Sequence, residues 1–265
     1  MHPIEHLRHV ARARGVDAST LVTETAYAMS AMRLEPEALV VACRRVVQRQ
    51  IECGPLWWFA SALLCAPDPD EVIWELVGQI SDDDTARHLG RLIDDDATVV
   101  TVGSGDHLVD ALARRGDLRV LSVDSHHTAT GVLRRLERAE VPADPVPAEG
   151  LAAAIGIASA VVIQTPAASP STALVPAGSL AAALAARHHS VPVWLVAPQG
   201  TVLPGEYLTH IVEHSIDADR PWECEFEVIE IDVVDSVITP TGALRPADLS
   251  PGCAFTPELL RISAI

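Results

Sequence analysis

The stretch VVTVGSGDHLVDAL, residues 99–112, decides the fold of this chain. An apolar run ends in Gly-Ser-Gly, and the residues that follow have the spacing of an amphipathic helix. A second apolar run, RVLSVD at residues 119–124, ends in Asp124. A strand, a glycine-containing turn, a helix and a second strand are the outline of a βαβ unit of the kind that binds nucleotides.

The same alternation continues through the rest of the chain from about residue 97. Short apolar runs predict strands at residues 97–103, 118–124, 143–148, 158–165, 191–197 and 225–232. Helical patterns separate them at residues 106–116, 127–140, 148–158 and 177–189. Apolar strands separated by helices favour a parallel sheet that is covered on both faces, and right-handed crossovers make such a sheet doubly wound.

The residues before this region are predicted to be helical. Six patterns occur, at residues 3–15, 17–34, 35–52, 54–66, 69–80 and 82–93. The pattern at 54–66 is nearly all apolar, which predicts a buried helix. The last pattern begins with acidic residues, as the helix dipole prefers. We therefore expect an α/β protein with a helical domain at residues 1–95 and a Rossmann-like domain, a doubly wound parallel sheet, at residues 96–265.

The charge and the apolar runs exclude several classes of partner. The formal net charge is −17, and because the chain contains no lysine, arginine supplies all 19 of its fixed positive charges. Such a chain is repelled by phosphate backbones, which argues against nucleic-acid binding. No apolar run approaches the roughly 20 residues of a membrane helix, and the first residues lack an apolar signal-peptide core. We expect a cytoplasmic protein with no membrane partner.

The cysteines argue against a metal centre. The chain has five, at positions 43, 53, 65, 224 and 253, and none forms a Cys-x-x-Cys pair. This spacing disfavours both a cysteine-based metal site and a disulfide framework, so we expect buried free thiols and assign no metal.

The Gly-Ser-Gly turn itself allows a cofactor site. Glycines after a first strand admit a ligand to the backbone, and Asp124 lies at the distance from which an acid binds a ribose diol. However, Leu108 stands where the third glycine of the dinucleotide motif belongs, and Asp106 would repel a pyrophosphate at the helix start. NAD- or S-adenosylmethionine-dependent chemistry therefore remains a minor alternative, and we assign no cofactor.

Other stretches carry a resemblance to a known family. They are DDDATVVTVGSG (94–105), VDSHHTATG (123–131), AVVIQT (160–165), AGSLAAALAARHHSVPVWLVA (177–197), VITPTGALRP (237–246) and CGPLWWFASALL (53–64). Their order and spacing resemble the family of translation initiation factor 2B α/β/δ subunits, methylthioribose-1-phosphate isomerase and ribose-1,5-bisphosphate isomerase. Asp124 and Gly131 fall on the ends of the family's Glu-Thr-Arg-Pro segment and its following glycine, and Gly178 and Ser179 take its Gly-Thr positions.

The departures from this family concern its chemistry. The resemblance implies a catalytic cysteine near Gly103 and a catalytic aspartate at residues 164–166, but these positions hold neither. His126 stands in place of the arginine of Glu-Thr-Arg-Pro, and Pro240 in place of the terminal glutamate. Val175 and Pro176 replace an Asn-Lys pair. The isomerase acid–base pair therefore cannot be transferred to this chain.

Two functions remain, together with a third, weaker alternative. The first is a divergent member of this family that binds a phosphorylated sugar or nucleotide without isomerase chemistry. The second is an aldose–ketose isomerase with replacement acid–base residues, for which the candidates are Asp106, Asp124 and His126. The third is a structural subunit of a catalytic relative. The resemblance also implies a homodimer or larger homo-oligomer. The predicted binding residues are Gly103, Ser104, Gly105, His126, Gln164, Thr165, Gly178 and Ser179.

Overall fold

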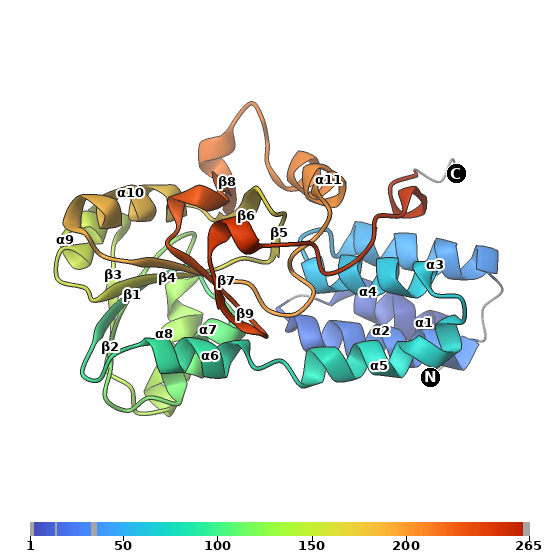
Figure 1. Cartoon of the computed structure of the whole chain (residues 1–265), viewed down its shortest axis with the longest axis horizontal. Coiled ribbons are helices and arrows are strands. Elements are labelled where there is room, and N and C mark those ends of the chain that lie inside the picture. The colour runs from blue at the N-terminus through green and yellow to red at the C-terminus, as the bar shows by residue number, and fades with distance from the viewer. Residues whose placement is uncertain (1–2, 14, 33–35, 262–265) are drawn as a thin grey trace.

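The computed structural model describes residues 3–13, 15–32 and 36–261 (Figure 1). A group of helices from the N-terminal part lies at one end of the molecule, and a sheet with helices on both faces lies at the other (Figure 1). The predicted helix ends near residues 33–35 fall outside the described residues. None of the described helices is long and apolar enough to cross a membrane.

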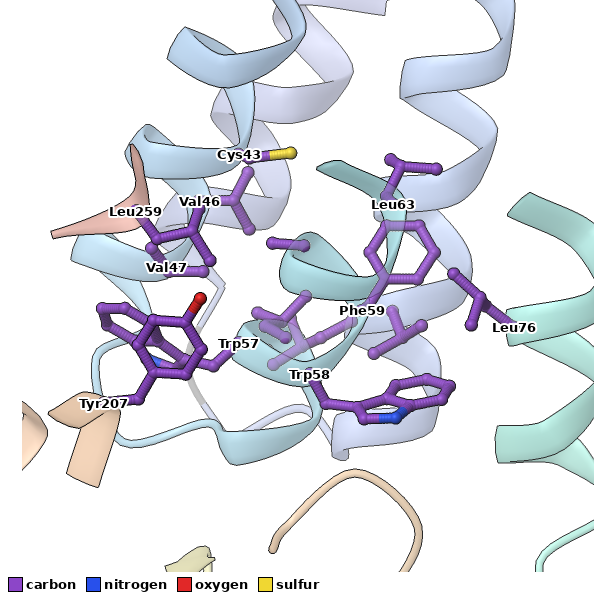
Figure 2. Packing of buried hydrophobic residues seen from close by; sticks show 14 of the residues in the cluster. Cys43, Val46, Val47, Trp57, Trp58, Phe59, Leu63, Leu76, Tyr207 and Leu259 are labelled. Carbon is purple, nitrogen blue, oxygen red and sulfur yellow. The ribbon is translucent and has the colours of Figure 1, made fainter. Parts of the chain in front are cut away.

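Five helices form the first group and share one apolar core. They are α1 (Pro3–Arg12), α2 (Ala18–Met32), α3 (Pro36–Arg49), α4 (Gly54–Cys65) and α5 (Pro69–Ser81). The predicted buried helix is α4, whose Trp57, Trp58 and Phe59 are at most 2% exposed. Figure 2 shows these rings among side chains of α3 and α5. Burial of three aromatic side chains from one turn makes α4 the centre of this core.

The second group is built on a seven-stranded sheet with the order β10-β9-β7-β4-β1-β2-β3. Neighbouring strands are parallel except β10 and β9, which are antiparallel. This confirms the predicted parallel sheet. The strands are β1 (Thr98–Val102), β2 (Arg119–Val123), β3 (Ala143–Val146), β4 (Ala160–Gln164), β7 (Val193–Val196), β9 (Ser236–Thr239) and β10 (Gly242–Leu244).

Helices cover both faces of this sheet, as the apolar strands predict. One face carries α6 (Thr85–Leu92), α7 (Asp106–Ala113) and α8 (Ala129–Arg138), and its core includes Val99 and Leu89. The other face carries α9 (Leu151–Ile155) and α10 (Ser179–His189), and its core includes Val100 and Ala182. Alternate residues of β1 thus enter different cores, because successive side chains of a strand point to opposite faces.

The segment predicted as a strand at residues 225–232 is a strand, β8 (Phe226–Glu230), but not part of the parallel sheet. It pairs antiparallel with β6 (Thr172–Pro176), which pairs with the two-residue β5 (Ala167–Ala168). The sequence patterns also did not predict β6, β9, β10 or the helix α11 (Gly205–Ser215). The three strands are short, and all four elements lie next to proline or glycine, residues that are typical of turns and loops.

The first group of helices and the second group, built on the sheet, are not divided at one point of the chain. Helix α6 packs with the sheet, since its Ala86 and Leu89 belong to the core on the α7 face. In return, α11 and the C-terminal segment pack on the first group, through Tyr207 and Leu259. The connection from α6 to β1 falls at residues 93–97. The division into domains at residues 95 and 96 stays a prediction.

Candidate functional site

The carboxyl ends of β1, β2, β4 and β7 lie along one edge of the sheet, which is where α/β proteins bind ligands. Most of the residues predicted for the site are in the loops of this edge. The Gly103–Gly105 turn follows β1, the His126 loop follows β2, and Gln164 ends β4. The segment from Pro176 to Ser179, after β6, packs against the same loops, since the Ser125 hydroxyl donates to the carbonyl of Ala177 at 2.7 Å.

The two glycines of the turn are needed for packing within the protein. Gly103 has φ +72°, and a Cβ there would lie 2.3 Å from Cγ of Pro176. A Cβ at Gly105 would lie 2.3 Å from the side-chain amide of Gln164. The side chains of Pro176 and Gln164 therefore occupy the space beside the backbone that these glycines leave open. Ser104, between them, is exposed.

Asp106, the first residue of α7, is held in an ion pair. Its Oδ1 lies 2.5 Å from Nη1 of Arg135 on α8, and Nη2 of the same guanidinium lies 2.7 Å from Oδ1 of Asp110. The two carboxylates share one arginine, which ties α7 to the second half of α8.

The loop after β2 holds the predicted Asp124 and His126. Oδ1 of Asp124 accepts from the backbone N–H of Ala129 at 3.3 Å, at the start of α8. His126 and His127 both adopt left-handed backbone conformations, with φ +48° and +63°, and both are exposed. Asp124 Oδ2 lies 3.8 Å from Nδ1 of His127. The structure therefore places Asp124 as a helix-capping residue and His126 at the surface.

Gln164 ends β4 and Thr165 follows it, and the two side chains lie in different environments. The Gln164 Oε1 accepts from the backbone N–H of Leu108 in α7 at 2.9 Å. Thr165 is fully buried, and its hydroxyl lies 2.7 Å from the carbonyl oxygens of both Ala167 and Leu174. Its hydroxyl thus joins the end of β4 to the three-stranded sheet of β5, β6 and β8.

Gly178 and Ser179 form the start of α10. Gly178 has φ +93°, and the buried Ser179 hydroxyl donates to the carbonyl of Pro176 at 2.6 Å. The backbone N–H of Leu180 donates to Oε1 of Glu227 on β8 at 2.8 Å. A carboxylate of the protein therefore already occupies part of this helix N-terminus, which is the position that an anion would take.

A cleft of about 420 Å³ opens where the carboxyl edge meets the first helical group. Of the predicted site residues, all of which lie in the described part of the chain, Asp106 and Gln164 line it. Its size is in the range of small-molecule sites. Its polar lining consists of Asp17, Ser19, Ser81, Asp83, Asp106, His107, Asp110, Arg114, Arg135, Gln164 and Gln199.

The most constrained group in the cleft is a carboxylate–imidazole pair. The Asp83 side chain is 2% exposed and lies 3.2 Å from Nε2 of His107. It also accepts from the backbone N–H groups of Thr85 and Gln199, each at 2.7 Å. Burial raises the pKa of Asp83, but the hydrogen bonds from His107, Thr85 and Gln199 outweigh burial and hold the pKa below its ordinary value of 3.8. Asp83 is therefore ionised at neutral pH.

An ionised Asp83 defines what His107 can do. When Nε2 carries the hydrogen that faces the carboxylate, Nδ1 is left as the acceptor nitrogen of the ring. An imidazole oriented in this way by a carboxylate is the usual arrangement of a general base. Sequence reasoning assigned the acids at residues 82–84 to the helix dipole. It missed the link to His107, because the two residues are 24 positions apart and meet only in the folded chain.

The cleft contains one arginine that is free to bind an anion. Arg135 is engaged by Asp106 and Asp110, whereas Arg114 at the end of α7 is exposed and makes no ion pair with another described residue. The carboxylates and the amides of Gln164 and Gln199 offer hydrogen-bond partners to hydroxyl groups.

The cysteines take no part in the cleft: among the described residues that line it there is none. All five are free thiols, as predicted, and burial raises the pKa of Cys43, Cys53 and Cys253 to about 12. The expectation of buried thiols is correct for Cys43; Cys53, Cys224 and Cys253 are partly buried, and Cys65 is exposed at the end of α4.

Comparison with known proteins gives matches in structure alone. No family model and no curated protein matches the chain. The translation initiation factor eIF-2B of Pyrococcus horikoshii OT3 matches over 92% of this chain and 97% of its own, with a TM-score of 0.76 and 16% identity. The eIF2B delta subunit of Chaetomium thermophilum matches over 90% and 97%, with a TM-score of 0.69 and 17% identity.

A third match is a chain of the tetrameric eIF2B-beta2-delta2 complex of Chaetomium thermophilum. It covers 92% of this chain and 90% of that one, with a TM-score of 0.71 and 14% identity. The resemblance found in the sequence is thus confirmed at the level of the fold, over nearly the whole chain.

Proposed function

We propose that this chain is a divergent member of the initiation factor 2B family that binds a phosphorylated sugar or nucleotide and lacks the family's isomerase acid–base pair. The observation that carries this proposal is the cleft at the carboxyl edge. It has the volume of a small-molecule site, one arginine that makes no ion pair with another described residue, and carboxylate and amide groups suited to hydroxyl groups. The similarity in fold to eIF-2B structures supports the family assignment.

The roles within the cleft follow from the contacts. Arg114 binds the phosphate, because Arg135 is already neutralised by two carboxylates. Gln164, Gln199 and Asp110 hydrogen-bond to sugar hydroxyls. The four carboxylates of the lining disfavour a ligand with several negative charges, so we expect a monophosphate.

The test is a thermal-shift screen of the full chain against pentose and hexose phosphates, nucleoside monophosphates, NAD and S-adenosylmethionine. A ligand at about 100 times its Kd stabilises by about 2.7 kcal/mol, which a melting curve resolves. We expect a shift with a monophosphate that is lost in Arg114→Ala and retained in Arg91→Ala, an exposed arginine of α6 outside the cleft. No shift with any phosphorylated compound, or an equal shift in both variants, contradicts the proposal.

A specific observation favours the isomerase as a second candidate. The sequence predicted Asp106, Asp124 or His126 as replacement acid–base residues. The contact between Asp83 and His107 makes these two residues the better candidates for that role. His107 would take the proton from the carbon beside the carbonyl and return it to the carbonyl carbon, while a second proton moves from the neighbouring hydroxyl to the carbonyl oxygen. Aldose–ketose interconversion followed by NMR decides between the candidates. Turnover that is lost in His107→Ala, with ligand binding retained, favours the enzyme; absence of turnover favours the binding protein.

We also propose a homodimer or larger homo-oligomer in the cytoplasm. One of the structures that this chain resembles is a tetrameric complex, and in this chain Ile157, Leu180 and Leu184, in and near α9 and α10, are apolar and exposed. Light scattering during size-exclusion chromatography measures the mass directly, and a monomer at micromolar concentration contradicts this part of the proposal.

A further inference from the structure

Three side chains on α11 form a cluster that the proposed function does not use. They are His210, Glu213 and His214, and their ligand atoms lie within 4.8 Å of one another. Positions i, i+3 and i+4 of a helix share one face, so the spacing alone brings the three together. Among the described residues, no other three His, Cys, Asp or Glu side chains approach one another in this way. None of the three lines the cleft.

Each of the two imidazoles makes a further contact that bears on its orientation. Nδ1 of His214 donates to the carbonyl oxygen of His210 at 2.8 Å, which leaves its Nε2 free as a ligand atom. Histidines that bind metals commonly donate their other N–H to a backbone carbonyl in this manner. The His210 ring is half-buried and packs edge-on against Trp57, with ring centroids 5.7 Å apart. The centroids of the two imidazole rings lie 4.2 Å apart.

The chemistry of the three groups selects the kind of ion. Two imidazoles and one carboxylate suit zinc and similar first-row transition metals, whereas calcium and magnesium prefer a set of oxygen ligands. We propose that His210, Glu213 and His214 form a binding site for a divalent transition metal ion, with zinc as the reference ion. Three protein ligands leave a fourth position open to water.

The site can be tested by calorimetric titration of the full chain with zinc, and by titration with Co²⁺, whose visible absorption reports the ligand set. His214→Ala is the first variant, because this side chain is exposed and its removal leaves the core intact. Glu213→Gln keeps the size of the side chain and removes its charge. The matched control is the double variant His188→Ala/His189→Ala, which removes two exposed imidazoles from α10.

We expect one zinc ion per chain, with affinity reduced at least about tenfold in His214→Ala and reduced also in Glu213→Gln, but unchanged in the control. The Co²⁺ absorption should follow the same order. Absence of saturable zinc binding by the native chain overturns the proposal. So does equal binding by His214→Ala and the control. Neither result bears on the proposed cleft, since phosphate binding there is measured without metal.

Discussion

At the scale of single residues, Asp83 combines two tasks. It accepts backbone N–H groups from Thr85 and Gln199, which join the start of α6 to the loop after β7, and it also orients His107. A carboxylate has acceptor capacity for all three donors, whereas an amide places an NH₂ group against one of them. A substitution of Asp83 should therefore affect both the stability of the fold and the position of His107 in the cleft.

We predict that Asp83→Asn lowers the free energy of unfolding at pH 7 by about 1 to 3 kcal/mol, because a buried donor loses its partner. The pH dependence should change too. Because the pKa of Asp83 is lowered on folding, its contribution is present above the ordinary pKa of 3.8 and is lost as the pH falls below it through the folded-state pKa. Urea denaturation between pH 3 and 7 measures both effects.

The control for this prediction is Asp82→Asn. Asp82 is the neighbouring acid, it is exposed, and its substitution should leave stability and its pH dependence nearly unchanged. If the two variants behave alike, the loss at Asp83 reflects charge near the helix start rather than its three hydrogen bonds.

At the scale of elements, α8 ends in a motif whose usual residue is missing. The N–H of Val141 bonds to the carbonyl of Leu136, and the N–H of Glu140 to that of Glu137, each at 3.0 Å. This is the Schellman pattern, in which the residue at the Glu140 position adopts the left-handed conformation and is most often glycine. Glu140 has φ +58°, and its negative charge also lies at the helix C-terminus, which the dipole disfavours.

We predict that Glu140→Gly raises the free energy of unfolding by about 1 kcal/mol, since it removes a left-handed residue with a Cβ and an unfavourable charge. Thermal or urea denaturation measures the gain. The control is Arg134→Gly in the middle of α8, where glycine should cost about 1 kcal/mol. A loss of stability in both variants would show that backbone strain at Glu140 is negligible.

At the scale of the whole molecule, the C-terminal segment ties the sheet to the first helical group. The indole N–H of Trp58 donates to the carbonyl of Gly252 at 3.1 Å, and Nη2 of Arg44 lies 2.9 Å from Oε2 of Glu258. Leu259 is fully buried and belongs to the same core as Tyr207 and Val47 (Figure 2). The C-terminal segment therefore completes a core formed mainly by α1 to α5.

We predict that Leu259→Ala lowers the free energy of unfolding by about 2 to 5 kcal/mol, as expected for a cavity at a buried leucine. The transition followed by tryptophan fluorescence should shift together with the one followed by far-UV circular dichroism, because the helices and the sheet are coupled through this segment. Leu260→Ala, at a partly buried site, is the control and should cost less. Two separate transitions in place of one would show that the helical group unfolds on its own.

The predictions from sequence succeeded where a pattern is local. Apolar runs that alternate with helical patterns predicted the parallel strands β1, β2, β4 and β7. The apolar segment 54–66 predicted the buried helix α4. The predicted strand at residues 225–232 went to the wrong sheet, because its pairing with β6 depends on a segment about 50 residues away. Periodicity reports how a segment is buried, but not which segment covers it.

The sequence by itself determined that this chain forms helices followed by a doubly wound sheet, with a glycine-containing turn after the first strand of that sheet. Only the tertiary structure decided which polar groups meet. It joined Asp83 to His107, engaged Arg135 with two carboxylates, and filled the space at the glycines with Pro176 and Gln164. The reason is physical: local periodicity fixes the elements, whereas a site depends on how elements distant in sequence pack together.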